Sequence, residues 1–104
     1  MAIPTICPVF GTVVYPNNNP ATPIRVVAEL SQKYNYDETQ IFMTSAETVT
    51  DENGEWTLDL IESATNLVSY TFKFYAGTEL LIAYSGVVVP NTITPTAFSS
   101  LVNY

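Results

Sequence analysis

Apolar and polar side chains alternate at every second residue in three segments, and this period most constrains the fold. The segments are 24–31, 55–60 and 69–74. Because successive side chains of a β-strand point to opposite faces, each segment is predicted to be a strand with one face in a core. None of them carries a convincing helical period. The apolar faces include Trp56, Phe72 and Phe74, which we therefore place in the core.

Three further segments are rich in β-branched and aromatic residues, and we predict strands at Val9–Tyr15, Gln40–Val49 and Leu80–Val89. Turn-forming residues separate the strands. The loop Tyr15–Pro20 holds two prolines and three asparagines, and the Asn-Gly pair of Asp51–Gly54 readily takes the positive φ values of a tight hairpin. The sequence therefore predicts an all-β fold, an antiparallel two-sheet β-sandwich of about six or seven strands.

The two ends are expected to lie outside this sandwich. We divide the chain into an N-terminal arm at 1–8, a sandwich domain at 9–90 and a C-terminal docking tail at 91–104. The tail resembles the start of a helical turn with Thr94 as N-cap and Pro95 at the first helical position. Phe98, Leu101 and Val102 share one face of it. Because so short a helix is marginal alone, the tail must dock, either on the open edge of its own sandwich or on another chain.

Composition narrows the class of function. The chain has 104 residues, enough for one core, and only 12% of them are charged, which is typical of a protein partly covered by neighbours. Its formal net charge is −7, and its three cations, Arg25, Lys33 and Lys73, are far apart. Nucleic acid and anionic membranes are therefore poor candidate partners. The acidity has two open interpretations, solubility or the attraction of a basic surface.

Counting excludes most familiar site chemistry. There is no histidine, and Cys7 is the single cysteine, which excludes Cys/His zinc sites, Ser–His–Asp triads and intramolecular disulfides. No cation stands beside Cys7, so we expect a small buried or half-buried hydrophobe and not a reactive thiol. Residues 1–10 carry neither a basic region nor a long apolar run, and no secretory signal or transmembrane span is expected. We predict no enzymatic activity and no cofactor.

Three segments of the chain carry a family pattern. Residues 10–15 with 24–28, and 50–58 with its Thr-Asp-x-x-Gly-x-Trp-x-Leu order, resemble the transthyretin-like or carboxypeptidase-regulatory-like β-sandwich domains. The similarity covers about Val9 to Val89. It implies a role in folding support, adhesion or assembly. The chain departs from transthyretin-type carriers and related hydrolases by lacking their histidine and basic channel residues.

Such domains also occur in phage virion proteins, where the last strand often runs into a Pro-Asn turn and a short segment with a Phe and a Leu. Residues 87–91 followed by 96–101 look like that arrangement. The resemblance implies a stand-alone virion component, such as a head-decoration, neck or fibre-base protein, located in the virion. Without that link, we expect a soluble protein with no signal peptide.

Two acidic features have both a functional and a structural interpretation. Asp51–Glu55 could hold calcium, because that ion takes clustered carboxylate and carbonyl oxygens, but a hairpin needs Asn-Gly for backbone reasons alone. The pairs Asp37/Glu38 and Asp59/Glu62 could serve acid–base chemistry, but chance produces such pairs among ten acids. We favour the structural interpretation in each case and predict no metal-binding or catalytic residue.

The loop 33–38 presents two tyrosines, which offer large amphipathic surface to a sugar or a protein. Our leading hypothesis is a structural protein that binds other virion or assembly proteins through its edges and termini, as a homo-oligomer or on a larger shell. The alternative is a carbohydrate-binding or adhesive module that uses Tyr34, Tyr36 and Tyr15 on a glycan. The candidate partner-binding residues are Ile3, Ile6, Tyr34, Tyr36, Phe98, Leu101 and Val102.

Overall fold

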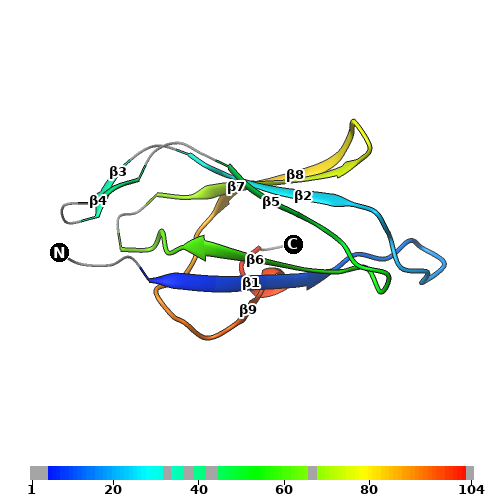
Figure 1. Cartoon of the computed structure of the whole chain (residues 1–104), viewed down its shortest axis with the longest axis horizontal. Helices are drawn as coiled ribbons and strands as arrows, with labels where there is room; N and C mark the ends of the chain where they lie inside the picture. Colours follow the sequence, from blue (N-terminus) through cyan, green and yellow to red (C-terminus); the bar gives the residue numbers. More distant parts are fainter. Residues whose placement is uncertain (1–4, 32–33, 37–38, 42–44, 66–67, 103–104) are drawn as a thin grey trace.

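Two β-sheets face each other across an apolar core in the computed structural model of the chain (Figure 1). The structure describes residues 5–31, 34–36, 39–41, 45–65 and 68–102, with 34–36 and 39–41 described as backbone. This architecture confirms the predicted all-β sandwich. A short 3-10 turn, η1 (Phe98–Ser100), follows the last strand and fits the predicted C-terminal turn.

The smaller sheet has three strands in the order β6-β1-β9. β1 (Ile6–Thr12) pairs along its whole length with antiparallel β6 (Glu55–Ile61). On its other side β1 meets β9 (Thr96–Ala97), a parallel neighbour that reaches only Val9 and Phe10. The short β9 therefore leaves most of that side of β1 without a ladder.

The larger sheet has four antiparallel strands in the order β5-β2-β7-β8. Their bounds are Ser45–Val49 for β5, Arg25–Leu30 for β2, Tyr70–Ala76 for β7 and Glu79–Val87 for β8. A separate hairpin pairs β3 (Tyr34–Tyr36) with β4 (Thr39–Ile41). β5 and β8 are thus the two edges of the larger sheet.

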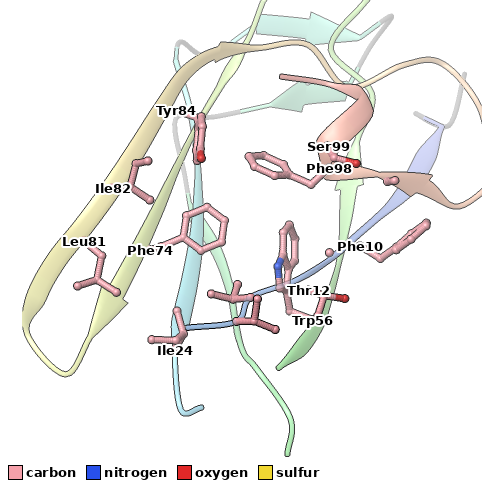
Figure 2. Close-up of a pocket in the computed structure, with 14 residues that line it drawn as sticks. Phe10, Thr12, Ile24, Trp56, Phe74, Leu81, Ile82, Tyr84, Phe98 and Ser99 are labelled. Atoms are coloured by element: carbon pink, nitrogen blue, oxygen red, sulfur yellow. The ribbon is translucent and has the colours of Figure 1, made fainter. Parts of the chain in front are cut away.

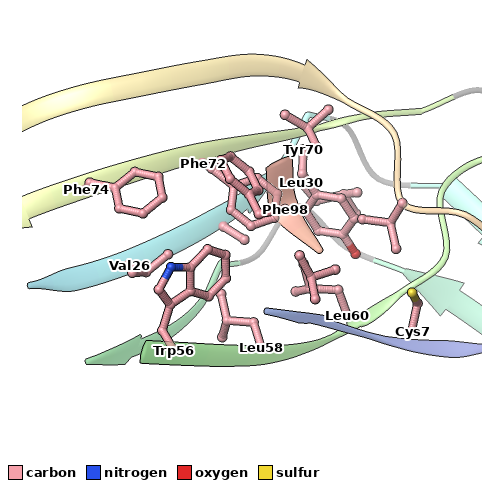
Figure 3. Packing of buried hydrophobic residues seen from close by; sticks show 14 of the residues in the cluster. Cys7, Val26, Leu30, Trp56, Leu58, Leu60, Tyr70, Phe72, Phe74 and Phe98 are labelled. Carbon is pink, nitrogen blue, oxygen red and sulfur yellow. The ribbon is translucent and has the colours of Figure 1, made fainter. Parts of the chain in front are cut away.

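The alternating segments take the predicted phase. Trp56, Phe72 and Phe74 are buried between the sheets, as expected (Figure 3). Cys7 is also fully buried, as expected, with its Sγ 3.4 Å from the Thr96 hydroxyl. The remaining large members of the core include Val9, Ile24, Val26, Leu30, Leu58, Leu60, Tyr70, Val87, Val89 and Phe98.

The predicted strand Val9–Tyr15 is displaced toward the N-terminus. β1 begins at Ile6, inside the predicted arm, because Ile6–Pro8 pair with β6. A proline is tolerated there since β9 does not reach it. After Thr12, the Val13 N–H instead donates to the Gly54 carbonyl at 2.8 Å, and the chain leaves the sheet.

The predicted strand Gln40–Val49 is two strands with different partners, because β4 pairs with β3 whereas β5 pairs with β2. The turn Asp51–Gly54 is present, but it joins strands of different sheets and only Gly54 has a positive φ, at 77°. The predicted strand Leu80–Val89 corresponds to β8, which ends at Val87, so that Val89 lies beyond the strand. There the Val89 N–H donates to Ser63 Oγ at 2.8 Å and holds the chain as it leaves the larger sheet.

The predicted tail is part of the folded domain. Thr96 and Ala97 pair with β1, and the N-cap of η1 is Ala97, not Thr94. Phe98 is buried, and Leu101 and Val102 pack half-buried against the core. Of the two docking alternatives, the structure shows the tail on its own sandwich. The helical turn therefore starts later than the predicted Thr94, because Thr96 and Ala97 pair with β1 before η1 begins.

Candidate functional site

One long side of the sandwich is closed by the chain itself. Residues 50–54 carry the backbone from β5 in the larger sheet to β6 in the smaller one (Figure 1). The buried Thr50 hydroxyl donates to the Ala21 carbonyl at 2.8 Å and accepts from the Ile24 N–H at 2.9 Å. These bonds tie the neighbouring loop to the crossing.

The other long side is open. Here the edge strand β8 of the larger sheet faces β9, η1 and the end of β1 in the smaller sheet, and the chain crosses between the sheets beyond the end of β8, through residues 88–95. A groove of about 540 Å³ lies in this opening (Figure 2). We call it the edge groove, and its lining is Phe10, Gly11, Thr12, Val13, Val14, Ile24, Trp56, Phe74, Leu81, Ile82, Tyr84, Ala97, Phe98 and Ser99.

The floor of the edge groove is an aromatic cluster organised around Phe98. Its ring centroid lies 5.2 Å from Tyr84, 5.6 Å from Trp56 and 5.7 Å from Phe74. All three pairs meet edge to face, an arrangement that aromatic quadrupoles favour. Phe98 thus links β6 to β7 and β8 and gives the groove a packed floor, with β8 side chains as one wall (Figure 2).

The wall strand β8 is apolar and exposed. Leu80, Leu81 and Ile82 are 48%, 49% and 47% exposed, and Glu79, at the start, is the single charged residue of the strand. Natural edge strands usually carry charges or prolines that prevent pairing with other chains. β8 has neither of these along Leu80–Val87, so its backbone edge is open to another strand.

β8 is longer than the strand it pairs with, and bulges absorb the difference. Phe74 pairs with Ile82 and Tyr75 with Leu80, which leaves Leu81 as an extra residue. A second irregularity lies near Gly86, whose φ is 70°. The first bulge places Leu81 beside Ile82 on the groove wall. Between the two irregularities, Ile82–Tyr84 form a regular stretch of strand.

The edge strands of the closed side have a different chemistry. Glu47 is the central residue of β5, and Glu55 and Asp59 are exposed on β6. On the outer face of the larger sheet, Arg25 pairs with Glu47 at 3.1 Å and Lys73 with Glu29 at 2.7 Å. Both cations within the described residues are therefore paired with carboxylates.

The acidic turn is built by its own hydrogen bonds. Asp51 Oδ1 accepts the N–H groups of Asn53 and Glu55 at 2.9 and 3.0 Å. In the part of the chain that the structure describes, no three potential metal ligands gather in one place. The carboxylate of Asp51 thus shapes the turn.

The predicted acidic pairs divide between described and undescribed residues. Asp59 is exposed on β6, whereas Glu62 is fully buried just after it and accepts the Thr65 N–H at 3.0 Å. The two carboxylates therefore have different surroundings. Asp37 and Glu38 lie outside the described residues.

Among the described side chains, the predicted partner-binding residues differ in exposure. Ile6 is 44% exposed on β1, whereas Phe98 is buried at the groove floor. Ile3 lies outside the described residues, and Tyr34 and Tyr36 are described only as backbone in β3. Tyr15 of the alternative glycan site is 47% exposed.

Sequence reasoning missed the wall of the groove, Leu81, Ile82 and Tyr84. The signal was the loss of alternation across 80–89, where apolar residues follow one another without charge. Such a run is typical of a strand buried on both faces. In this chain it forms an exposed edge.

Within the described part of the chain, no helix has the length and apolar character needed to span a membrane. Comparison with protein-family models and with curated proteins gave no match to this chain.

Proposed function

We propose that the chain is a non-enzymatic structural protein that binds neighbouring subunits of an assembly along the open side of its sandwich. The sequence resemblance implies a phage virion as that assembly. The observation that carries the proposal is the combination of an uncharged edge strand, β8, with the apolar edge groove beside it. An extended segment of a neighbour fits both features.

The mode of binding is strand addition. A partner strand hydrogen-bonds to the free backbone edge of β8, and every second side chain of the partner enters the edge groove beside Ile82 and Tyr84. The backbone bonds contribute affinity, and the groove selects apolar side chains. The packed aromatic floor around Phe98 limits how deeply the partner's side chains penetrate.

The charge distribution supports a protein partner over nucleic acid. Arg25 and Lys73 are engaged by Glu47 and Glu29, so neither is available to neutralise a phosphate. β8 adds no positive charge. A partner that binds there must do so through its backbone and apolar side chains.

The single tryptophan makes the proposal testable, because Trp56 lies in the lining of the edge groove. A synthetic nonapeptide of alternating Val and Thr should change its fluorescence saturably and protect the amides of β8 from hydrogen exchange. Ile82→Lys should abolish both effects. Val49→Lys is the matched control, because Val49 is 52% exposed on the opposite edge strand.

Absence of any saturable change with the peptide, in a protein whose circular dichroism shows an intact sheet, would contradict the proposal. A glycan array tests the alternative function. Selective binding of a sugar that is lost in Tyr36→Ala would replace strand addition by carbohydrate recognition.

A further inference from the structure

We propose that the strand added to β8 is β8 of a second copy, antiparallel, about a two-fold axis that passes through Ala83. This inference rests on the proposed function and names the partner of the same edge. The two larger sheets would join into one continuous sheet in the order β5-β2-β7-β8-β8-β7-β2-β5. A two-fold contact of this kind uses the same surface on both subunits and closes on itself.

Charge is the first argument for a second copy. Each chain carries a formal net charge of −7, so two copies can meet only where few charges face each other. On β8 the one charged residue is Glu79, at the start of the strand. In the proposed pair Glu79 lies opposite Val87, and the two Glu79 residues are about 27 Å apart along the strands. That separation exceeds a screening length of about 10 Å.

The opposite edge of the larger sheet, β5, disfavours this arrangement. On β5 the central residue is Glu47, and a two-fold pair of β5 strands would place the two Glu47 residues opposite each other. Like charges directly opposite destabilise an antiparallel pair. A basic partner, in turn, would find no carboxylate along Leu80–Val87 to bind. β8 is thus suited to an uncharged strand, and a second β8 is one.

The register is the second argument. Ala83 is the middle residue of β8 and lies in its regular stretch between the two irregularities. An axis there pairs Ile82 of each copy with Tyr84 of the other, and Leu81 with Ser85. A β-branched residue opposite an aromatic one is a favourable cross-strand pair. Both possible hydrogen-bonding phases of an antiparallel pair accept such an axis.

Burial is the third argument. Leu80, Leu81 and Ile82 are each about half exposed in the single chain. The added strand would cover them on the edge and would extend the wall of the edge groove with side chains of the second copy. The apolar exposure of β8 is then explained by its partner.

A disulfide test follows from the axis. Residues directly opposite in an antiparallel pair have Cα atoms about 4.5 to 5.5 Å apart, which a disulfide spans. Ala83→Cys, in the full chain under mild oxidation, should form a cross-linked dimer that reductant reverses. Thr78→Cys is the control. It is exposed at the turn before β8, and the two copies of residue 78 would be about 34 Å apart. It should stay monomeric on a non-reducing gel, as should the parent, whose Cys7 is buried.

Sedimentation equilibrium gives an independent measure. The parent should show a concentration-dependent dimer, and Ile82→Lys should raise its dissociation constant about a hundredfold or more, because two lysines would approach each other at the axis. Val49→Lys should leave that constant unchanged. Circular dichroism should show the same sheet signal in all three proteins.

The outcomes separate this inference from the proposed function. If the parent is monomeric and Ala83→Cys does not cross-link, but the alternating Val-Thr peptide still changes Trp56 fluorescence, the second copy is the wrong partner and edge binding stands. If the peptide has no effect either, both fail. A dimer that persists in Ile82→Lys, while Ala83→Cys forms no cross-link, places the contact elsewhere and overturns the inference.

Discussion

The two long sides of the sandwich expose similar lengths of strand edge, but their edge strands differ in charge and in how the chain covers them. On the closed side the chain crosses between the sheets at 50–54, and the edge strands carry Glu47, Glu55 and Asp59. On the open side the edge strand β8 is uncharged after Glu79 and borders the edge groove. A protein that must only stay folded and separate needs both edges protected. The difference teaches that protection here is selective and that the unprotected side is the one available for contact.

The largest expected effect tests the closed side. Gly54 has a φ of 77°, and a Cβ there would lie 2.3 Å from the Val13 carbonyl oxygen. Gly54→Ala should therefore cost about 4 kcal/mol or more of the free energy of unfolding, through backbone strain and loss of the Val13–Gly54 hydrogen bond. Urea unfolding gives the value.

Gly77 is the matched control at the tip of the open-side hairpin. Its φ is 63°, but no atom lies within 4 Å of the position that a Cβ would take. Gly77→Ala should cost about 1 to 2 kcal/mol from conformation alone. Equal losses in the two variants would show that the crossing is no more tightly built than the hairpin.

The second prediction concerns the floor of the open side. Phe98→Ala should lower the free energy of unfolding by about 3 to 5 kcal/mol, because it removes the ring that links Trp56, Phe74 and Tyr84. Ile93→Ala, in the same C-terminal segment at 78% exposure, should change it by less than about 0.5 kcal/mol. Thermal melts of both compare them directly. A small loss for Phe98→Ala would mean that the segment docks loosely and can leave the groove.

The third prediction is smaller and concerns the contact between Gly11 and Trp56. A Cβ on Gly11 would lie 2.8 Å from the indole Nε1. Gly11→Ala should displace the indole and cost about 1 to 3 kcal/mol. The displacement should shift the Trp56 emission maximum, which fluorescence records together with the unfolding curve. An unchanged spectrum would show that the two residues do not touch.

The smallest expected effect concerns the Lys73–Glu29 ion pair on the outer face of the larger sheet. The hydrogen bond from Lys73 to Glu29, and then the Glu29 charge, raise the pKa of Lys73 above its usual value of 10.5. A raised pKa in the folded state means that the pair stabilises the fold fully below the ordinary lysine pKa of 10.5 and that this contribution fades as the pH rises through the folded pKa. The melting temperature of Lys73→Met should fall slightly below that of the parent at neutral pH, and the gap should close in strong alkali. A constant gap would assign the effect to packing.

The interior of the sandwich could be predicted from the sequence, because buried apolar residues recur at every second position of a strand. Trp56, Phe72 and Phe74 each stand in an alternating run, and the strand geometry forces them to one face. The turn at Gly54 was also predictable, since few residues other than glycine take its φ. Local chemistry determined these features, so a single sequence was sufficient.

The edge groove could not be predicted, because it depends on which strands become neighbours. The run 80–89 has the apolar density of a central strand, and only the order β5-β2-β7-β8 makes it an edge. For a related reason the burial of Phe98 could not be predicted, because the spacing of Phe98, Leu101 and Val102 indicates only that they share a docking face. The burial of Phe98 depends on the parallel pairing of β9 with β1, which sequence spacing does not reveal.

The parallel pairing of β9 with β1 also has a consequence for the folding rate. Cys7 and Thr96, whose side chains meet beside this pairing, are 89 positions apart in the chain. Contacts of such separation form slowly, because a long loop must close before any of its bonds is made. Until then Phe98 cannot cover its side of Trp56, and we expect that part of the ring to be accessible near the apolar segment 80–82. Two partly folded chains that meet in that interval can associate through these surfaces, so the yield of refolding should fall as the protein concentration rises.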